Sequence, residues 1–463
     1  MQTAKSIFIG GTASHVGKSW MATAICAYLR RRGLRVAPFK AQNMSNNSYP
    51  CPSGGEIGRA QVAQAEACGL EPSPDMNPIL LKPTRDTSSQ VVLHGKVWRD
   101  LTAKEYYEHY DFLQSQVLDA YDRLSARHEV IVIEGAGSVA ELNLRDRDLV
   151  NFGLALKLDA PTLLVSDIDR GGVFGALFGT MSLLEPEERH LVRAFAVNRF
   201  RGDPSLFTAG AALLEAKLCR PCLGVFPFDP NIHIDEEDAV SIDSRPSKQE
   251  SAIAVIHLPH ISNFTDFRRL PAFDWLTRPP NRDYRIIFIP GTKNTTGDLQ
   301  WLRTTGLADW ILEQHASGAT VVGICGGYQM LGKQISDPDL VEGVAREVRG
   351  LGLLPVRTVM RREKVTHRVR VRLPNGVSFY AYEIHMGETD VEPGVDHFAE
   401  NEGVVANHCI GTYLHGAFEN EDVLRTTLGI EPKPVRSRAE QYESLASWFA
   451  HSADIPLFEE RFL

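Results

Sequence analysis

The sequence predicts an α/β protein with largely parallel sheets. Short apolar runs alternate with helix-like stretches along nearly the whole chain, which is the pattern of such folds. At 463 residues the chain is longer than one hydrophobic core usually supports, so we expect two domains. The clearest apolar runs cover residues 7–10, 130–133, 162–165, 253–256, 286–289 and 321–324.

A polar stretch over residues 243–251 marks the expected boundary between the domains. It contains a proline and has no periodicity, as is typical of a linker, and a strand-like run restarts at Ala252. We therefore expect an N-terminal domain over residues 1–240, a linker over 241–251 and a C-terminal domain over 252–463.

Composition and charge limit the class of protein. The net charge of −9 gives no support for nucleic acid or an anionic membrane as a partner. No stretch of about 18 apolar residues occurs, and residues 1–10 lack the apolar core of a signal peptide, so no membrane span is expected. Seven cysteines, an odd number, indicate free thiols and hence a cytoplasmic location. Cys219 and Cys222 have metal-ligand spacing but no second such pair, so we expect no metal there.

A phosphate-binding loop is predicted between the first strand and the first helix. Its candidate residues are Gly11, Thr12, Gly17, Lys18 and Ser19. Backbone N–H groups would hold the phosphates, Lys18 would add a positive charge, and the Ser19 hydroxyl suits magnesium. Five residues separate Gly11 from Gly17, one more than in the common pattern G-x-x-x-x-G-K-[ST]. The strand before the loop and the helix pattern after it still favour a nucleotide as the ligand.

Acidic side chains follow two more of the predicted strands. Glu134 comes directly after the run 130–133, where a P-loop enzyme holds magnesium. Asp167, Asp169 and Arg170 lie on the loop after the run 162–165. Because ligands of parallel sheets bind outside the carboxyl ends of the strands, this loop is a candidate substrate or metal site. A simple solvated turn is the alternative for both loops.

A cysteine nucleophile is predicted at the end of the run 321–324. Cys325 is followed by two glycines and a helix-like segment, an arrangement similar to the G-x-S-x-G elbow with sulfur in place of oxygen. The dipole at the helix N-terminus favours the thiolate form. A buried structural cysteine is the alternative, but such a position does not need the flanking glycines.

Cys325 needs a base, and His415 is the best candidate. It lies in the segment Gly-Thr-Tyr-Leu-His-Gly over residues 411–416, where a further strand is expected to end. Gly291, on the glycine loop after the run 286–289, and Gly326 are expected to donate backbone N–H groups to a developing oxyanion. These residues together predict a site in which the cysteine sulfur attacks a carbonyl carbon and forms a thioester.

Taken in order, these motifs resemble the cobyric acid synthase family, the glutamine-hydrolysing amidases of corrinoid biosynthesis. The resemblance extends essentially from end to end, and several motifs in one order are more specific than any one alone. The longer glycine loop is similar to that of dethiobiotin synthetase, a P-loop branch that activates carboxylates. The implied fold is a dethiobiotin-synthetase-like P-loop domain followed by an α/β domain of the class I glutamine amidotransferase type. The segments that carry the resemblance lie at residues 11–19, 40–48, 134–138, 167–174, 198–203, 323–331, 382–387 and 411–416.

The resemblance implies a carbon–nitrogen ligase that uses ATP, glutamine and a corrinoid. The b, d, e and g carboxylates of adenosylcobyrinic acid a,c-diamide would become carboxamides through an acyl phosphate. Cys325 and His415 would release the ammonia in the C-terminal domain, and a sheltered route or a closure between the domains would protect it from protonation. ATP and Mg²⁺ are the implied cofactors, with no tightly bound organic cofactor.

The resemblance also extends the candidate sites. By similarity to dethiobiotin synthetase, Glu56 is a second magnesium carboxylate beside Ser19 and Glu134. The loop with Asp167, Asp169 and Arg170, introduced above, becomes the candidate edge of the corrinoid site. A homo-oligomer is compatible with the sequence.

One departure concerns the group that orients His415. Triad amidotransferases usually have a glutamate two residues after the histidine, and here that position is Ala417. The resembled family has the same gap, which implies low basal glutaminase activity and orientation by another group. Glu383 and Glu419 are the candidates that the sequence offers.

Two alternatives stay open at this point. A related enzyme, cobyrinic acid a,c-diamide synthase, has the same two-domain organisation but amidates other carboxylates. Partitioning ATPases share the P-loop branch but act by dimerising on DNA or membrane. The amidase-like second half and the acidic net charge speak against a partitioning ATPase.

Overall fold

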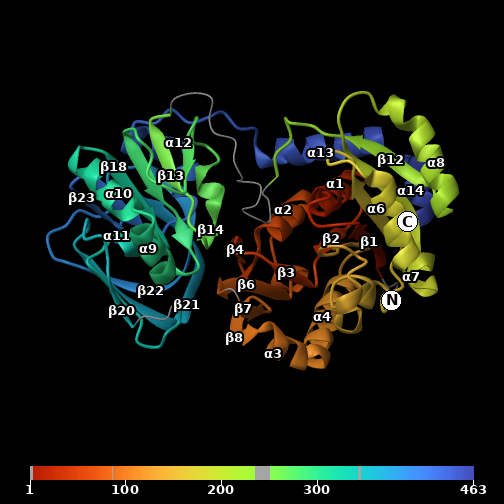
Figure 1. Cartoon of the computed structure of the whole chain (residues 1–463), viewed down its shortest axis with the longest axis horizontal. Coiled ribbons are helices and arrows are strands. Elements are labelled where there is room, and N and C mark those ends of the chain that lie inside the picture. The colour runs from red at the N-terminus through yellow and green to blue at the C-terminus, as the bar shows by residue number, and fades with distance from the viewer. Residues whose placement is uncertain (1–3, 86, 235–250, 343–345) are drawn as a thin grey trace.

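The computed structural model describes residues 4–85, 87–234, 251–342 and 346–463, and shows two α/β domains beside each other (Figure 1). Each domain is built on a six-stranded sheet, so the predicted fold class is confirmed. The predicted linker, 241–251, lies outside the described residues except for Ser251. No helix among the described residues has the length and apolar character that a membrane crossing requires.

The main sheet of the first domain is entirely parallel. Its strand order is β12-β11-β10-β1-β9-β2. Because β1 is flanked by β10 and β9, the loop after β1 lies between the loops that follow these two neighbours. The strands are β1 (Lys5–Gly11), β2 (Val36–Phe39), β9 (Val130–Glu134), β10 (Thr162–Asp167), β11 (Val192–Phe200) and β12 (Cys222–Pro227).

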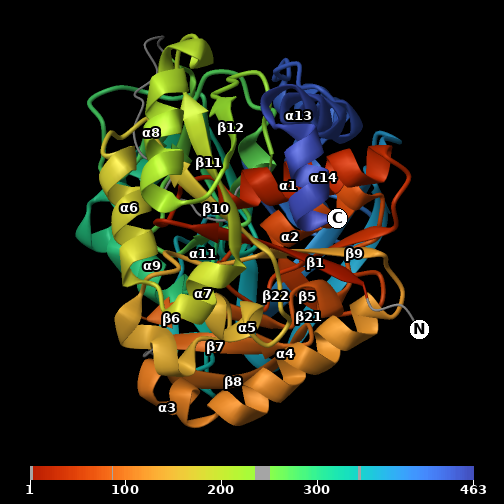
Figure 2. The same cartoon turned by 90° about the vertical axis from the view of Figure 1, so that its right-hand side faces the viewer.

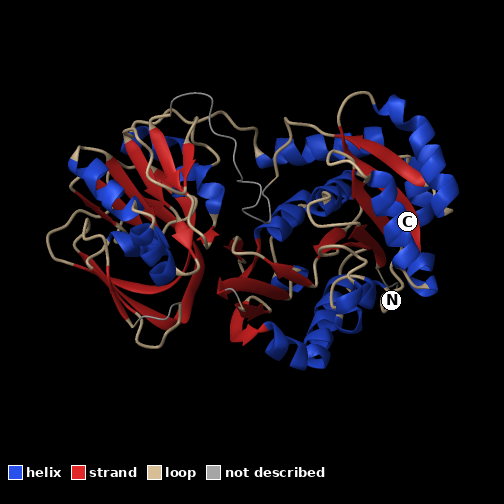
Figure 3. Ribbon diagram, viewed as in Figure 1, coloured by secondary structure: helices blue, strands red, loops and turns tan. Residues whose placement is uncertain are grey.

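Helices cover both faces of this sheet (Figure 3). Side chains of β1 alternate between the two faces, so that Ile7 and Ile9 pack in one core and Phe8 packs in the other. The helices of the first domain are α1 (Lys18–Arg31), α2 (Arg59–Cys68), α3 (Ala103–Glu108), α4 (Tyr110–Ser125), α5 (Phe152–Ala155), α6 (Val173–Leu183), α7 (Pro186–Leu191) and α8 (Thr208–Leu218).

Two small sheets of the first domain lie toward the second domain (Figure 1). One has the order β3-β6-β7-β8 and the other pairs β4 with β5. Strand β4 packs against the long strands β21 and β22 of the second domain. The strands are β3 (Gln42–Met44), β4 (Ser48–Pro50), β5 (Glu56–Gly58), β6 (Ile79–Arg85), β7 (Ser88–Leu93) and β8 (Lys96–Thr102).

The second domain has its own sheet in the order β15-β13-β16-β18-β24-β23, parallel except for the pair β23 and β24. A four-stranded sheet, β20-β19-β21-β22, and the short pair β14 and β17 complete it. The strands are β13 (Ile253–Ile256), β14 (Ile261–Ser262), β15 (Asp274–Leu276), β16 (Ile286–Ile289), β17 (Gly291–Thr292), β18 (Thr320–Ile324), β19 (Gln334–Ser336), β20 (Glu347–Arg349), β21 (Val356–Arg372), β22 (Ser378–Val391), β23 (Val404–Ala406) and β24 (Cys409–Thr412). The helices are α9 (Thr295–Thr304), α10 (Leu307–Ala316), α11 (Gly326–Leu331) and α12 (Glu421–Leu428).

The last two helices return to the first domain (Figure 2). Helices α13 (Arg438–Ser452) and α14 (Ile455–Phe462) pack beside α1. The ring of Phe449 lies 5.2 Å from that of Tyr28 and 5.9 Å from that of Phe226. The sequence-based division assigned residues up to 463 to the second domain. In the structure, the apolar faces of these two helices complete the core of the first domain instead.

Candidate active sites

Cys325 lies at a sharp turn between β18 and α11. Its backbone has φ 52° and ψ −109°, a region that residues other than glycine rarely adopt. A Cβ on Gly327 would lie 2.0 Å from the carbonyl oxygen of Ile289, so the close approach of the turn to β16 requires glycine. The Cys325 N–H donates to the Thr412 carbonyl oxygen at 2.8 Å. The turn thus has the geometry of a strand-to-helix elbow.

His415 and Asp266 form a buried pair close to this turn. Nδ1 of His415 lies 2.8 Å from Oδ2 of Asp266, and Oδ1 of Asp266 accepts from the Gly416 N–H. The imidazole is 0% exposed and the carboxylate 1%. With Nδ1 held by a carboxylate, Nε2 is the nitrogen available to the Cys325 thiol, as in Ser-His-Asp triads.

Asp266 is the functional candidate that the sequence did not reveal. It lies in the 3₁₀ turn Phe264–Phe267, 149 residues before the histidine that it contacts. Neither sequence-based candidate orients the ring, because Glu383 contacts His385 at 3.0 Å and Glu419 pairs with Arg438 at 3.5 Å. No strand-end or glycine pattern marks Asp266, so nothing in the sequence distinguished it from other acidic loop residues.

The surroundings of His415 favour its protonated form. Burial lowers the pKa of an imidazole, but the charge and hydrogen bond of Asp266, helped by the nearby Cys325, raise the pKa of His415 to about 10. Nε2 of His415 has no other hydrogen-bond partner among the described residues, so it is available to the nearby Cys325 thiol. The ring of Tyr382 stacks on the imidazole at 5.2 Å. A protonated imidazole in this position can act as a general acid.

The two predicted oxyanion residues lie next to this site. A Cβ on Gly291 would lie 3.0 Å from Cε1 of His415, and a Cβ on Gly326 would lie 3.1 Å from the backbone nitrogen of Thr292. The glycine loop after β16 and the first turn of α11 therefore meet beside the thiol. Their role as N–H donors stays a prediction.

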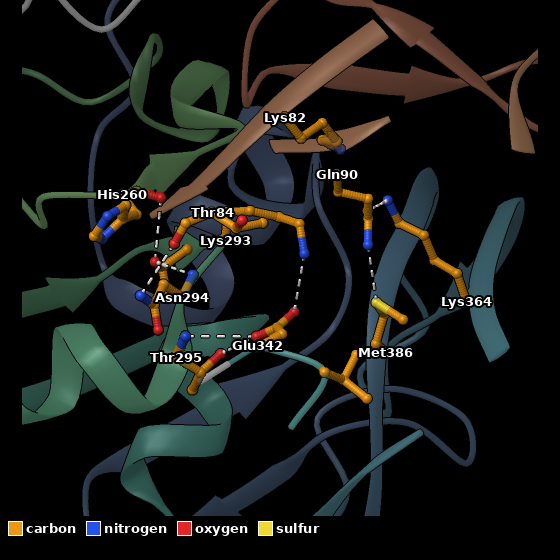
Figure 4. Close-up of polar contacts among 12 residues, drawn as sticks. Lys82, Thr84, Gln90, His260, Lys293, Asn294, Thr295, Glu342, Lys364 and Met386 are labelled. Atoms are coloured by element: carbon orange, nitrogen blue, oxygen red, sulfur yellow. Dashed lines mark hydrogen bonds and ion pairs between the residues drawn. The ribbon is translucent and has the colours of Figure 1, made fainter. Parts of the chain in front are cut away.

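A pocket lies beside Cys325 at the boundary between the domains, and its lining includes Lys82 from the first domain. Two opposite charges face each other in it. Nζ of Lys293 lies 3.6 Å from Oε1 of Glu342, and the Thr295 hydroxyl donates to Oε2 at 2.9 Å (Figure 4). The Thr295 hydroxyl also contacts the amide oxygen of Gln329 at 3.0 Å. The pocket thus offers a cation and an anion within reach of a nucleophile.

Contacts between the domains surround this pocket (Figure 4). The Asn294 amide donates to the Thr84 carbonyl oxygen at 3.3 Å. On the other side, the Gln90 amide donates to the sulfur of Met386 at 3.7 Å. Met386 and Lys82 both line the pocket, so the first domain forms part of its wall.

Glu56 lies in a buried cluster at the same boundary. Its Oε2 accepts from Nζ of Lys82 at 2.7 Å and from the Ser48 hydroxyl at 2.6 Å, and its Oε1 accepts from Nζ of Lys364. Burial raises the pKa of a carboxyl, but Lys364 and Lys82 together hold the pKa of Glu56 well below its usual range. Burial lowers the pKa of Lys364 to about 8. The structure does not bring Glu56 into contact with Ser19 or Glu134, and its role as a magnesium ligand stays a prediction.

The phosphate-binding loop has the expected strand–loop–helix context. Gly17 has φ 95°, and a Cβ there would lie 2.1 Å from Nδ2 of Asn198, so the position requires glycine. Nζ of Lys18 donates to the carbonyl oxygens of Ala13 at 3.0 Å and Gly137 at 2.7 Å. These bonds hold the Lys18 ammonium across the loop, where a phosphate would replace neutral carbonyl partners.

Glu134 joins the loop to two neighbouring elements. Its Oε1 accepts from the Ser19 hydroxyl at 2.7 Å and from Nζ of Lys40 at 2.9 Å, and its Oε2 accepts from the Gln64 amide. Burial raises the pKa of a carboxyl, but Lys40 and these hydrogen bonds lower the pKa of Glu134 overall. An ionised carboxylate beside a serine hydroxyl fits Mg²⁺, whose other ligands would be phosphate oxygens and water. No cluster of three or more potential metal-binding side chains occurs in the described part of the chain.

The loop after β10 lies next to the phosphate-binding loop, since the Thr12 and Ser166 hydroxyls are 2.9 Å apart. Asp167 pairs with Arg199 at 3.2 Å, and Asp169 pairs with Arg201 at 2.5 Å. The charge and hydrogen bond of Arg201 lower the pKa of Asp169, while Arg170 is exposed. The structure therefore places Asp167, Asp169 and Arg170 on the loop beside the phosphate-binding loop. The two carboxylates are paired there with arginines of β11 and of the turn that follows it, and their role in binding substrate stays a prediction.

Two family profiles match the chain. The profile of the CobB/CobQ-like glutamine amidotransferase domain matches residues 252–423, and that of the CobQ/CobB/MinD/ParA nucleotide binding domain matches residues 7–242. With these profiles, the fold and the two sites define a glutamine-dependent amidating ligase with a nucleotide-binding domain. A partitioning ATPase is excluded because the second domain is an amidotransferase.

Curated relatives narrow the class further. The cobyric acid synthase of Chlorobaculum tepidum is 45% identical over 97% of this chain and 96% of its own length. Those of Phocaeicola vulgatus and Dehalococcoides mccartyi are 43% and 41% identical, each over 97% of its own length. The chain belongs to the cobyric acid synthase family, and thus to cobalamin biosynthesis, as its motifs predict.

Proposed function

We propose that this chain amidates the b, d, e and g carboxylates of adenosylcobyrinic acid a,c-diamide, with glutamine as the nitrogen source and ATP as the activating substrate. One observation carries the proposal. A Cys325–His415–Asp266 constellation in one domain borders an interface with a second domain that contains a phosphate-binding loop. The end-to-end similarity to cobyric acid synthases supports the choice of acceptor.

In the glutaminase step, the Cys325 sulfur attacks the carboxamide carbon of glutamine. The developing oxyanion receives hydrogen bonds from the backbone N–H groups at Gly291 and Gly326. His415 gives its proton to the leaving nitrogen, and ammonia departs as the thioester forms. Water, deprotonated by His415, then attacks the thioester, releases glutamate and restores the thiol–imidazole pair.

The charged pair in the pocket suits the amino acid end of glutamine. A free amino acid carries an ammonium and a carboxylate on one carbon, and Glu342 and Lys293 offer the complementary charges. The hydroxyl and the backbone N–H of Thr295 both donate to Oε2 of Glu342 and fix its position. Binding of glutamine would therefore exchange the Lys293–Glu342 contact for two contacts with substrate.

In the synthetase step, the acceptor carboxylate attacks the γ-phosphate of ATP, which gives an acyl phosphate and ADP. Lys18 stabilises the negative charge on the transferring phosphoryl group. When bound, Mg²⁺ supplies further charge neutralisation, and Ser19 and Glu134 are the residues that would hold it. Ammonia then attacks the acyl carbon, phosphate leaves, and the amide forms.

Ammonia must move from one domain to the other without being protonated. The wall of the pocket beside Cys325 includes Lys82 and Lys364 of the cluster around Glu56, and Met386. A thiol site that opens toward the synthetase domain supports transfer within the docked molecule. Bulk water would convert most of the ammonia to ammonium, which has no lone pair for attack.

Mass spectrometry of the corrinoid product tests the proposal. After incubation with the a,c-diamide, ATP and glutamine, we expect four successive exchanges of a hydroxyl for an amino group. Amidation of cobyrinic acid at a and c, with none on the a,c-diamide, would favour the reaction of cobyrinic acid a,c-diamide synthase instead. Glutamate release without any change in the corrinoid would contradict both acceptors.

A further inference from the structure

A segment of the first domain reaches the turn that carries Asp266. The backbone N–H of Asn263 donates to Oδ1 of Asn47 at 2.7 Å, and the N–H of Ser48 donates to Oδ1 of Asn263 at 2.9 Å. Asn47 is 3% and Asn263 4% exposed, so both hydrogen bonds are shielded from water. Asn263 and the adjacent residues Asn47 and Ser48 thus form a clasp of two hydrogen bonds between the domains.

The clasp acts on a residue in an uncommon conformation. Asn263 has φ 53° and ψ 46°, and it begins the 3₁₀ turn Phe264–Phe267. Asparagine tolerates this left-handed region but does not require it, so surrounding contacts must select it. The two bonds of the clasp fix the N–H and the side chain of Asn263. They therefore set the direction of the turn that presents Asp266 to His415.

The same segment supports His415 from a second side. The ring of Tyr49 lies 4.7 Å from that of Tyr382, and the ring of Tyr382 stacks on His415. Tyr382 and His415 also exchange two backbone hydrogen bonds, of 3.0 and 2.9 Å. Residues 47–49 thus contact both neighbours of the imidazole, the carboxylate turn and the stacking ring.

The other end of this segment is fixed in the first domain. The Arg59 N–H donates to the carbonyl oxygen of Asn47 at 3.0 Å, and the Ser45 N–H donates to that of Leu81 at 3.0 Å. Asn47 is therefore held by its own domain and does not move freely with the glutaminase. A residue that is fixed in its own domain can hold its partner in a defined position, whereas a mobile residue cannot.

We propose that Asn47 is a positioning residue of the glutaminase, contributed by the nucleotide-binding domain. By holding Asn263, it keeps Asp266 on Nδ1 of His415, so the catalytic imidazole is correctly oriented when the two domains are docked. Glutamine hydrolysis is thereby tied to the arrangement in which ammonia has an acceptor. The inference rests on the proposed glutaminase role of Cys325 and His415.

The test compares glutamate release with ammonia-dependent amidation in Asn47→Ala. We expect kcat for glutamate release to fall about 10- to 100-fold, because a small misplacement of a catalytic group has effects of that size. The KM for glutamine should change much less than kcat, since Asn47 does not itself line the pocket and the Lys293–Glu342 pair is left in place. Amidation from ammonium chloride should also stay within about twofold, which shows that the synthetase domain is folded.

Two further variants make the comparison specific. Glu71→Gln removes an exposed contact between the domains, Arg368 to Glu71 at 2.8 Å, and changes neither bond of the clasp, so it should leave glutamate release unchanged. Asn47→Asp keeps an oxygen acceptor for the Asn263 N–H and should recover part of the activity that Asn47→Ala loses.

Three outcomes would overturn the proposal. These are glutamate release in Asn47→Ala close to that of the parent, an equal loss of glutamine- and ammonia-dependent amidation, and an equal effect of Glu71→Gln. Failure of the glutaminase assignment itself has another signature, since Cys325→Ser would then still release glutamate.

Discussion

Oδ2 of Asp266 lies 2.8 Å from Nδ1 of His415, although the two residues belong to opposite ends of the second domain. The position two residues after the histidine, where amidotransferase triads usually have a carboxylate, is Ala417. The carboxylate is supplied instead by a turn near the start of the domain. Geometry and role, rather than position in the chain, identify the third member of such a constellation.

Asp266→Asn should reduce glutamate release by about 10²- to 10⁴-fold, because the amide cannot hold the imidazole in the same tautomer. Asp266 raises the pKa of His415, so in the variant this pKa falls and the alkaline limb of the pH–rate profile moves to lower pH. Stopped assays of glutamate at several pH values measure both effects. Glu383→Gln is the matched control, and a similar loss there would contradict the assignment.

The same pair predicts a pH dependence of stability. The folded-state pKa of His415, about 10, lies above its ordinary value of 6.5. The pair therefore stabilises the fold fully below pH 6.5, and this contribution is lost as pH rises through about 10. Urea unfolding should show that Asp266→Asn lowers the free energy of unfolding most near pH 6.5 and less as the pH rises toward 10. A destabilisation that grows with pH would contradict the predicted direction of this pH dependence.

Cys325→Ser should abolish glutamine-dependent amidation and leave amidation from ammonium salts largely intact. A serine hydroxyl at this position is a much weaker nucleophile than the cysteine sulfur. Parallel assays with the two nitrogen sources measure the split. Loss of both activities would mean that Cys325 is not simply the glutaminase nucleophile.

Lys18→Ala should stop amidation from either nitrogen source, because both need the phosphoryl transfer that the Lys18 ammonium stabilises. Release of ADP in the presence of the corrinoid provides the measurement. Lys5→Ala, which changes an exposed lysine at the start of β1, the strand before the phosphate-binding loop, should have no effect. Ammonia-driven turnover retained by Lys18→Ala would contradict the phosphate role.

Glu56→Gln should destabilise the docked molecule by about 3–5 kcal/mol, because it leaves the buried ammonium groups of Lys82 and Lys364 without a counter-charge. Thermal unfolding measures the loss, and the double variant Glu56→Gln, Lys364→Met should recover part of it. The magnesium requirement of ammonia-driven amidation is the discriminating readout. An increased requirement without a loss of stability would support the sequence-based role of Glu56 as a magnesium ligand.

Phe449→Ala should lower the free energy of unfolding by about 3–5 kcal/mol, since it removes a buried ring from the core shared with Tyr28 and Phe226. The loss should appear as weaker ATP binding as well as a lower midpoint of denaturation, because the ring lies in the nucleotide-binding domain. Phe178→Ala removes an exposed ring and serves as the control. Equal effects of the two variants would speak against this packing.

Several features could be predicted because the chain marks them locally. Apolar runs gave the central strands, and glycines at tight turns marked the loops of Gly17 and Cys325. The position of Lys40 beside Glu134 follows from strand register. Lys40 follows Phe39, which pairs with Ile133 in the parallel register of β2 and β9, so it lies opposite Glu134.

Other features depend on contacts that local patterns do not encode. Asp266 lies in an irregular turn. Its contact with His415 depends on the arrangement of the six-stranded sheet of the second domain, which no local pattern encodes. The sequence marks Glu56 only through a family resemblance, and no local pattern pairs it with Lys364 of the other domain. The apolar faces of α13 and α14 indicate burial but not the surface that they cover. Long-range pairing, rather than propensity, decides each of these cases.

The return of α13 and α14 has a consequence for how the two halves of the molecule can move. The backbone crosses between them twice, once between β12 and β13 and once between Ile430 and Arg438. A body tethered at two points can swing about the line through them but cannot drift away. It follows that a gene fragment ending after the amidotransferase would leave its nucleotide-binding companion with an open apolar groove along α1.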